Sequence, residues 1–321
     1  MTRVVCLGVH IVDILGRPVE RIPEGQRSHF LDEIRMTVAG TAAGTAVDLA
    51  KLGAEVSVIG AVGCDALGSF LLDRMVEYGI DTRSVVRKDR VQTSATILPI
   101  RPNGERPALH VVGANAELTL DDIDWEIIAR AHHLHLGGLL RLFKLDGEPA
   151  ATILRFARQR RIITTVDVLG VNRPDSLEVL LPTLPYIDYF LPNLEEARHI
   201  SGLDDPALIA QFFLDRGVGC VVLKNGADGS LLYTLGTRMH LPALEALVVD
   251  SAGCGDAYCA GFITGLSLGW DLHRAAQLGT AAASLVLTGL GSDAGIIDLN
   301  TTVAFMEQAS VVALTPRTIH R

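Results

Sequence analysis

The chain has 321 residues, of which 49% are hydrophobic, and it carries a formal net charge of −9. This composition predicts a globular protein with a large core, and no uninterrupted apolar segment reaches the roughly 18 residues of a membrane span. The negative charge and the lack of a Lys/Arg-rich block argue against a nucleic-acid partner. The five cysteines form no CxxC pair and the N-terminus does not resemble a signal peptide, so we expect reduced thiols and a cytoplasmic protein.

Short β-rich runs alternate with helical patterns along the whole chain. Runs such as VVCLG, VSVIGAV and CVVLK are separated by helix-like segments, and Gly53 and Gly79 stand where two of these helices should end. Such alternation is typical of a parallel sheet covered by helices. We therefore expect the α/β class.

Two regions, residues 15–38 and 91–112, interrupt this alternation. They lack helical periodicity, and within the second region 93–100 and 108–112 are predicted to be strands joined by the turn PNGE. We expect two β-hairpins that form a small lid over one edge of the main sheet. Residues 1–310 would then be a single domain with this lid inserted, and 311–321 would be a loose C-terminal tail.

The segment VVDSAGCGDAYCAGFITGL, residues 248–266, is a candidate anion site. A strand that enters a Gly-rich turn and then a helix brings backbone N–H groups to the positive end of the helix dipole. Asp256 would repel a bound phosphate by about 1 kcal/mol even at water-like screening. In phosphoryl transfer, however, a carboxylate orients the attacking hydroxyl and accepts its proton. The alternative is that Asp256 is a first-turn acid that only stabilises the helix.

The same segment resembles the signature of the ribokinase-like (PfkB) family of carbohydrate kinases. DSAGCGD stands where the family has Asp-Thr-x-Gly-Ala-Gly-Asp, and further similarity lies in GVHIVD, residues 39–68, GANAEL, LPNLEEA and VVLKNGADGSLLY. The similarity extends over residues 3–298. It implies a three-layer α/β/α fold with a central, mostly parallel sheet and a small β-lid.

The resemblance also implies an ATP-dependent, Mg²⁺-assisted sugar kinase in which Asp256 is the base. The anion hole for the γ-phosphate would be formed by the backbone of Ala252, Gly253, Cys254 and Gly255. The substrate would be bound by Asp13, Gly40, Thr41, Gly44 and Asn115. The nucleotide would be bound by Asn193, Lys224, Gly226, Gly229 and Gly291. Glu196 and Asn193 would hold Mg²⁺ through water, and Asp250 would lie near a K⁺ ion.

The sequence departs from the family pattern at Gly44, where the family has an asparagine that contacts sugar hydroxyls. The change removes a donor and leaves room, and Thr41 and Thr45 are the residues that could compensate. The acceptor is therefore expected to be a monosaccharide or a sugar acid. A nucleoside is the alternative, since its ribose offers Asp13 the same diol, and Phe30 is a candidate for stacking on its base.

Several other interpretations are weaker. Histidines 132, 133 and 135 could bind a metal, but no Cys or Glu stands nearby at ligand spacing; His135 or Arg141 could instead contact substrate. Asn193 could simply cap a helix. A Rossmann oxidoreductase would need more glycines than LGVHIVD contains. A non-catalytic nucleotide-binding regulator is expected to lack catalytic residues, whereas Asp256, Asn193 and Glu196 are all present. Exposed lid strands could also support a homodimer.

Overall fold

The computed structural model describes residues 2–102, 105–170 and 173–312. In this described part, nine strands form a main sheet in the order β13-β12-β11-β10-β9-β8-β1-β4-β5. The pairs from β5 to β11 are parallel, whereas β12 and β13 are antiparallel additions at one edge. The strands are β1 (Arg3–Gly8), β4 (Glu55–Gly63), β5 (Asp81–Lys88), β8 (His133–Leu139), β9 (Ile163–Val168), β10 (Tyr189–Phe190), β11 (Cys220–Lys224), β12 (Ser230–Tyr233) and β13 (Arg238–Leu241).

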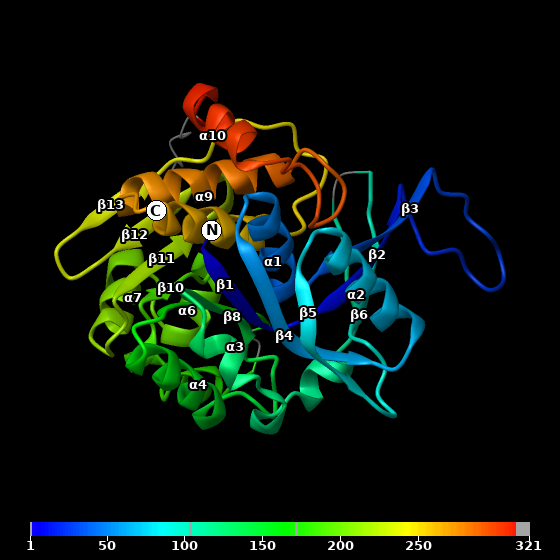
Figure 1. Cartoon of the computed structure of the whole chain (residues 1–321). Helices are drawn as coiled ribbons and strands as arrows, with labels where there is room; N and C mark the ends of the chain where they lie inside the picture. The colour runs from blue at the N-terminus through cyan, green and yellow to red at the C-terminus, as the bar shows by residue number, and fades with distance from the viewer. Residues whose placement is uncertain (1, 103–104, 171–172, 313–321) are drawn as a thin grey trace.

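Helices cover both faces of this sheet (Figure 1). One face is covered by α1 (Thr41–Lys51), α2 (Ala66–Glu77), α8 (Cys254–Ser267) and α9 (Leu272–Val286), with α10 (Leu299–Gln308) packed on α9. The other face is covered by α3 (Trp125–Ala129), α4 (Glu148–Gln159), α5 (Ser176–Leu180), α6 (Leu194–Ser201) and α7 (Pro206–Leu214). Gly53 and Gly79 follow α1 and α2 with positive φ angles, as expected for C-terminal caps.

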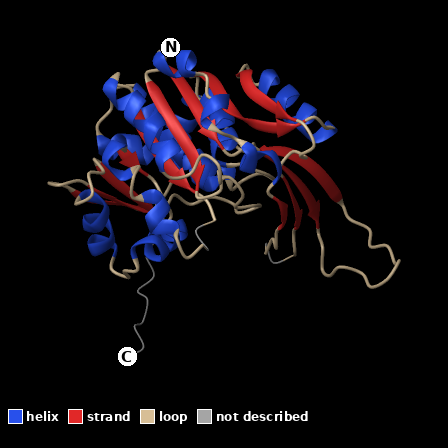
Figure 2. Cartoon of the chain, turned by 90° about the horizontal axis from the view of Figure 1, so that it is seen from below, coloured by secondary structure: helices blue, strands red, loops and turns tan. Residues whose placement is uncertain are grey.

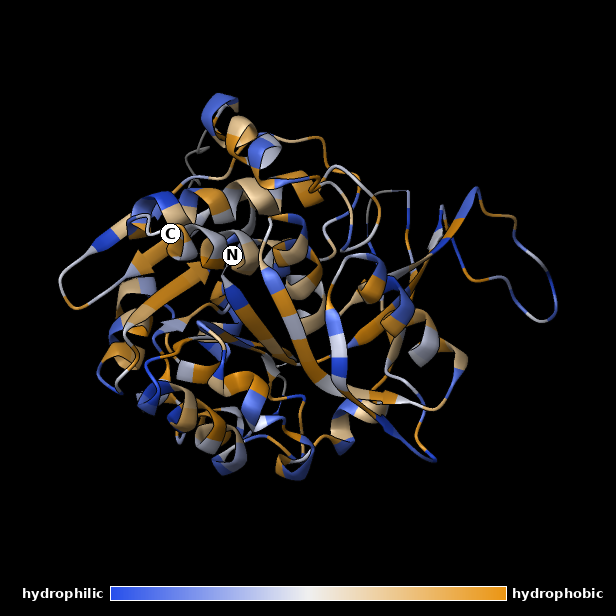
Figure 3. Cartoon of the chain, viewed as in Figure 1, coloured by the Kyte–Doolittle hydropathy of each residue, from blue (hydrophilic) through white to orange (hydrophobic). Residues whose placement is uncertain are grey.

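The alternation of side chains along the strands builds the two cores. In β1, Val5 and Leu7 pack against the helices α3–α7, and Val4 and Cys6 pack against α1 and α8. All four side chains are buried, and burying an aliphatic side chain contributes roughly 1.5–3 kcal/mol. Figure 3 shows the long apolar stretches in the strands of the main sheet. The expected three-layer α/β/α fold is confirmed.

A second, four-stranded sheet projects from this body (Figure 2) and is called the small sheet below. Its order is β3-β2-β6-β7, with β2 (Ile11–Arg17), β3 (Glu33–Ala39), β6 (Ala95–Pro99) and β7 (Leu109–Val111). β6 and β7 lie within the predicted lid region 91–112 and nearly all of β3 lies within 15–38, whereas β2 begins at Ile11, before the predicted boundary. The predicted turn PNGE includes residues 103–104, which lie outside the described part of the chain.

The two faces of the small sheet differ in polarity. Asp13 of β2 pairs with Thr37 of β3 and Thr96 of β6, so these polar side chains share one face with His110. The opposite face exposes apolar side chains, namely Ile34, Met36, Ile97, Leu109 and Val111. The polar face is turned toward the loop 289–295, because Leu15 and Leu98 pack with Leu290.

The strand order reverses on the two sides of β1, with β4 on one side and β8 on the other. In open parallel sheets, ligands bind beyond the carboxyl ends of the strands at such a reversal. Asp167, Asn193 and Lys224 stand at or just after the carboxyl ends of β9, β10 and β11. The topology therefore places these side chains at one edge of the sheet.

The predicted tail begins with residues that pair with the body of the protein. Val311 forms an antiparallel bridge with Leu244, and the N–H of Val312 donates to the carbonyl of Ala243. The remaining tail residues, 313–321, lie outside the described part. None of the helices in the described residues has the length and hydropathy required to span a membrane.

Candidate active site

The Gly-rich turn leads directly into the N-terminus of α8. Gly253 precedes this helix with φ 78°, and a Cβ added to it would lie 2.4 Å from the Cβ of Ser292. Only glycine fits this left-handed, crowded position. The first N–H groups of a helix lack partners within the helix and lie at its positive end. The turn therefore has the geometry of an anion site.

One of the expected donors of this anion hole is used elsewhere. The N–H of Ala252 donates to Asp250 Oδ1 over 3.0 Å, so the candidate anion hole has fewer backbone donors than the sequence indicated. The N–H groups of Gly253, Cys254 and Gly255 remain as candidate donors. Burial raises the pKa of the Cys254 thiol to about 12, so this side chain stays neutral.

Asp256 lies in the first turn of α8 and is held close to α1. Its backbone carbonyl accepts a hydrogen bond from Thr45 Oγ1 over 3.3 Å. Burial, followed by the negative charge of Asp167, raises the pKa of Asp256 to about 7, against the opposing charge of Lys224. A carboxylate with this pKa accepts a proton near neutral pH much more readily than an ordinary aspartate does.

Gly44 makes this position of Asp256 possible. A Cβ added to Gly44 would lie 2.7 Å from Asp256 Oδ2. The carboxylate of Asp256 therefore lies directly against Gly44, where a side chain would displace it. Phe30, the candidate for stacking, is 92% exposed in the connection between β2 and β3.

A buried charge cluster lies beneath the turn. Lys224 Nζ donates to Asp167 Oδ2 over 2.7 Å, and a Cβ added to Gly255 would lie 3.3 Å from this nitrogen. Although burial lowers the pKa of Lys224, the charges of Asp167, Cys259 and Glu196 raise it above its ordinary value. The contact with Asp167 and the proximity to Gly255 place the positive charge of Lys224 beside the Gly-rich turn. Its expected role in nucleotide binding stays a prediction.

Asn193 and Glu196 form a reciprocal cap at the start of α6. Asn193 Oδ1 accepts from the N–H of Glu196 over 2.8 Å, and Glu196 Oε2 accepts from the N–H of Asn193 over 2.9 Å. Burial, followed by the negative charge of Asp167, raises the pKa of Glu196 to about 7. The capping role of Asn193 is confirmed, and the cap holds both side chains beside the charge cluster.

The turn between β11 and β12 carries Gly226 and Gly229, with φ angles of 54° and 84°. A Cβ added to Gly226 would meet no heavy atom within 4 Å, whereas one on Gly229 would lie 1.9 Å from the carbonyl oxygen of Leu241. Gly226 thus leaves its backbone open to a ligand, and Gly229 is required for the turn.

On the small sheet, Asp13 is the acidic residue nearest to the turn. Burial raises its pKa to about 6, while the hydrogen bond from Thr96 and the charge of Arg106 lower it. Arg106 Nε also lies 3.7 Å from Asp250 Oδ1. Arg106 therefore lies between the two carboxylates, facing both the small sheet and the turn.

The remaining predicted substrate residues lie around the start of α1. Gly40 precedes this helix with φ 94°, and Thr41 Oγ1 is buried without a partner among the described residues. The side chain of Asn115 makes two hydrogen bonds, because Oδ1 accepts from the N–H of His10 and Nδ2 donates to its carbonyl. Asn115 thus fixes the corner before β2, and its expected contact with the substrate stays a prediction.

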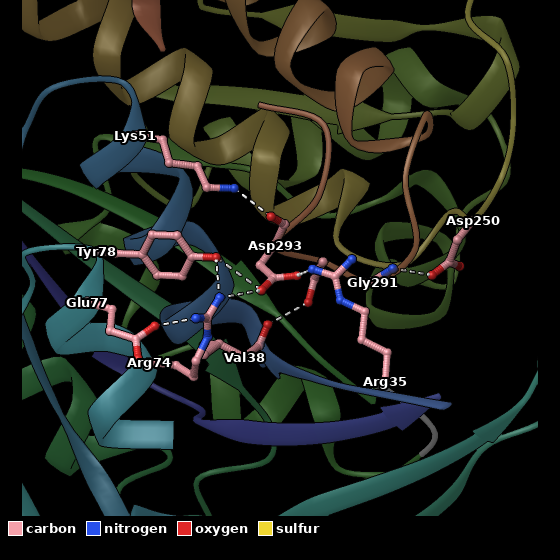
Figure 4. Close-up of polar contacts among 10 residues, drawn as sticks. Arg35, Val38, Lys51, Arg74, Glu77, Tyr78, Asp250, Gly291 and Asp293 are labelled. Carbon is pink, nitrogen blue, oxygen red and sulfur yellow. Dashed lines mark hydrogen bonds and ion pairs between the residues drawn. The ribbon is translucent and has the colours of Figure 1, made fainter. Parts of the chain in front are cut away.

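Asp250 and Gly291 are joined by a hydrogen bond. The N–H of Gly291 donates to Asp250 Oδ2 over 2.9 Å, as Figure 4 shows. A Cβ added to Gly291 would lie 2.6 Å from a side-chain atom of Thr37. Gly291 therefore lies between the turn and β3 of the small sheet, and its expected position over adenine stays a prediction.

The histidines of β8 have structural partners. His133 and His135 share a face of the strand, and both contact Thr165 Oγ1 at 3.2 and 3.0 Å. Burial lowers both pKa values to about 3, so these rings are neutral. Across residues 2–102, 105–170 and 173–312, no group of three or more His, Cys, Asp or Glu side chains could hold a metal ion.

Sequence reasoning missed three residues of the site. Asp167 could have been found, because it ends a buried strand at the edge where ligands bind. Arg106 follows the PNGE turn, and nothing in its neighbourhood in the sequence indicates that it reaches Asp250. Asp48 is fully buried one turn after Gly44, and burial raises its pKa well above the ordinary value.

Comparison with known proteins agrees with this geometry. The model of the pfkB family carbohydrate kinases matches residues 1–298. The chain is 29% identical over 286 residues to the 5-dehydro-2-deoxygluconokinase of Geobacillus kaustophilus. The aligned region covers 84% of this chain and 85% of that protein.

Solved structures share the fold. The ribokinase of Arabidopsis thaliana, complexed with ribose and ATP, superposes with a TM-score of 0.80 at 22% identity, covering 95% of this chain and 98% of that one. An E. coli protein assigned as a ribokinase II, in complex with ATP and Mg²⁺, gives 0.84 at 22% identity, covering 96% and 99%. The chain therefore belongs to the pfkB family of carbohydrate kinases and is an ATP-dependent sugar kinase, which transfers a phosphoryl group to an alcohol.

Proposed function

We propose that this kinase phosphorylates an acidic monosaccharide, such as a sugar acid, and that Asp256 accepts the proton of the reacting hydroxyl. The observation that carries the choice of substrate is the position of Arg106. This guanidinium lies close enough to lower the pKa of Asp13 and is 3.7 Å from Asp250. A carboxylate on the substrate would find in it a planar, bidentate donor.

Two further basic groups lie near the polar face of the small sheet. His110 Nδ1 is 3.0 Å from Thr96 Oγ1, and the nearby charge of Arg141 adds to burial in lowering the pKa of His110. Asp13, in contrast, offers only acceptors and suits a pair of hydroxyls. The combination of one acceptor and several donors fits a polyhydroxy acid. The relative from G. kaustophilus is named for a gluconate derivative, which is such an acid.

The turn and the charge cluster would act on the transferring group. The N–H groups of Gly253, Cys254 and Gly255 would stabilise its oxygens, with the charge of Lys224 behind them. Asp256 would orient the hydroxyl of the substrate and take its proton late in a loose transition state. The small sheet would cover the sugar and exclude water, which competes as acceptor.

The nucleotide would lie along the turn that contains Gly226, where the backbone is open. Asn193 and Glu196 would hold Mg²⁺ through water molecules, since both side chains are already used in the cap of α6. When bound, Mg²⁺ supplies charge neutralisation between the phosphate groups.

The residues around Asp250 do not favour a K⁺ ion there. Its two carboxylate oxygens accept hydrogen bonds from the N–H groups of Ala252 and Gly291, and Arg106 supplies a positive charge nearby. We expect turnover in buffers that contain only tetramethylammonium to equal turnover in K⁺. Activation by K⁺ of tenfold or more would show that the ion is required.

The exposed apolar face of the small sheet suits a homodimer. Ile34, Ile97 and Leu109 are 71%, 53% and 61% exposed on it, and such a patch tends to be covered by a partner. Replacing Ile97 and Leu109 by lysine should give a monomer in light scattering, whereas a dimer that persists would exclude this face. A cytoplasmic location stays a prediction.

An acceptor screen tests the proposed function. Purified protein with ATP and Mg²⁺ would be assayed for ADP release with sugar acids, with the neutral sugars of the same stereochemistry, and with nucleosides. We expect kcat/KM to be highest for a sugar acid, and Asp256→Asn to lower turnover by about 10³-fold. Higher kcat/KM for a neutral sugar or a nucleoside would contradict the choice of substrate class.

A further inference from the structure

The loop 289–295 lies between the small sheet and the turn 250–255 (Figure 4). On one side, Ser292 Oγ donates to the carbonyl of Val38 in β3 over 2.7 Å. On the other side, the N–H of Gly291 donates to Asp250, and Ser292 packs directly on Gly253. The loop therefore contacts both the element that carries Asp13 and the element that carries the anion hole.

Asp293 anchors this loop through side chains from three different elements. Its carboxylate, 2% exposed, accepts from Arg35 of β3 over 2.9 Å and from Tyr78 Oη, just after α2, over 3.2 Å, and Arg74 of α2 lies 4.0 Å away. Its backbone carbonyl accepts from Lys51 Nζ of α1 over 2.5 Å. Figure 4 shows all of these groups converging on Asp293.

The charges explain why the carboxylate matters. Arg35 and Arg74 face the buried carboxylate of Asp293, and Glu77 pairs with Arg74 at the exposed rim. Lys51 contacts the backbone carbonyl of Asp293 and also faces Asp48, a second buried acid. Without the charge of Asp293, Arg35 and Arg74 would repel each other in a partly buried space, and loss of one partner of a buried ion pair is strongly unfavourable. The loop is therefore held in place by charge compensation.

We propose that Asp293 is a positioning residue that clamps the loop 289–295 and so fixes the small sheet relative to the anion hole. This rests on the proposed roles of the turn 253–255 and of Asp13. Through Gly291, the clamp sets the orientation of Asp250, which also accepts from Ala252 at the start of the turn. A small displacement of this turn would move the donors away from the transferring phosphoryl group, which is costly even at about 1 Å.

The test compares Asp293→Asn with Glu77→Gln, a control that removes an acid from the same cluster without touching the loop. We expect Asp293→Asn to lower kcat and kcat/KM equally, by at least tenfold, with little change in KM for ATP. Glu77→Gln should keep the wild-type kcat. Hydrogen exchange of the amides of Gly291 and Ala252 should accelerate at least tenfold in Asp293→Asn only.

A double variant separates positioning from stability. Adding Arg35→Gln to Asp293→Asn removes one uncompensated cation, so the melting temperature should recover while kcat stays low. Recovery of kcat together with the melting temperature would overturn the proposal, as would wild-type amide exchange in Asp293→Asn. If the wild-type protein phosphorylates no acceptor, the proposed function fails, whereas the exchange measurement still tests the clamp.

Discussion

The phosphoryl side and the substrate side of the site are built in different ways. The phosphoryl side is a continuous turn, 250–256, fixed by Gly253 at the start of α8. The substrate side collects Asp13, Thr96 and Arg106 from separate segments of the small sheet and its loops. The proposed task of the turn is phosphoryl transfer, whereas the proposed residues of the substrate side would depend on which acceptor is bound. The first is therefore recognisable in a short sequence and the second is not.

The strongest test of the phosphoryl side is Asp256→Asn. Loss of the base should lower kcat by about 10³-fold, within the usual range for general-base catalysis. ATP affinity should stay equal or increase, because a negative charge near the phosphates is removed. Stopped assays of turnover and calorimetry of ATP binding measure the two effects. Asp73→Asn, an exposed acid on α2, is the control, and turnover near the wild-type rate in Asp256→Asn would refute the assignment.

Gly44→Ala tests how the two sides meet. The added Cβ would lie 2.7 Å from Asp256 Oδ2 and should displace the carboxylate. We expect kcat to fall by about 10–100-fold, as misplacement of a reacting group does, while the melting temperature changes little. Gly236→Ala is the matched control, since a Cβ there meets no heavy atom within 4 Å. Equal kcat values for the two variants would show that the position of Asp256 tolerates the change.

Arg106→Gln tests the substrate side alone. With a sugar acid as acceptor, KM should rise about tenfold, which corresponds to roughly 1.4 kcal/mol for a lost charge-assisted contact. With the neutral sugar of the same stereochemistry, KM should hardly change. Arg101→Gln in the same loop, whose partner is Glu105, serves as control. A similar rise in KM for both acceptors would exclude recognition of the carboxylate by Arg106.

The smallest expected effect is a shift in the titration of Asp256. In Asp167→Asn, a negative charge that raises the pKa of Asp256 is removed, and Lys224 loses its partner. Both changes favour the ionised carboxylate, so the pKa of Asp256 should fall below about 7. Carboxyl ¹³C NMR of labelled aspartates measures it, with Asp256→Asn used for assignment. An unchanged or higher value would disprove the role of Asp167.

The sequence predicted the layers of the fold, the lid strands and the turn because periodicity and glycine spacing are local signals. The position of Gly44 against Asp256 could not be predicted, since it depends on how α1 packs on α8. The occupied N–H of Ala252 and the buried Lys224 depend in the same way on tertiary contacts. The clamp around Asp293 joins residues more than 200 positions apart, and no local sequence pattern predicts such contacts.

The central claim is that a buried aspartate, held near neutrality by its surroundings, is the base for phosphoryl transfer to a sugar. The pH dependence of kcat/KM with the best acceptor tests it most directly, in the wild type and in Asp256→Asn. Because the base must be ionised, the wild-type value should fall as the pH drops through about 7. In Asp256→Asn the residual kcat/KM should not fall over this pH range. A variant with undiminished turnover and the same fall in kcat/KM near pH 7 would contradict the account.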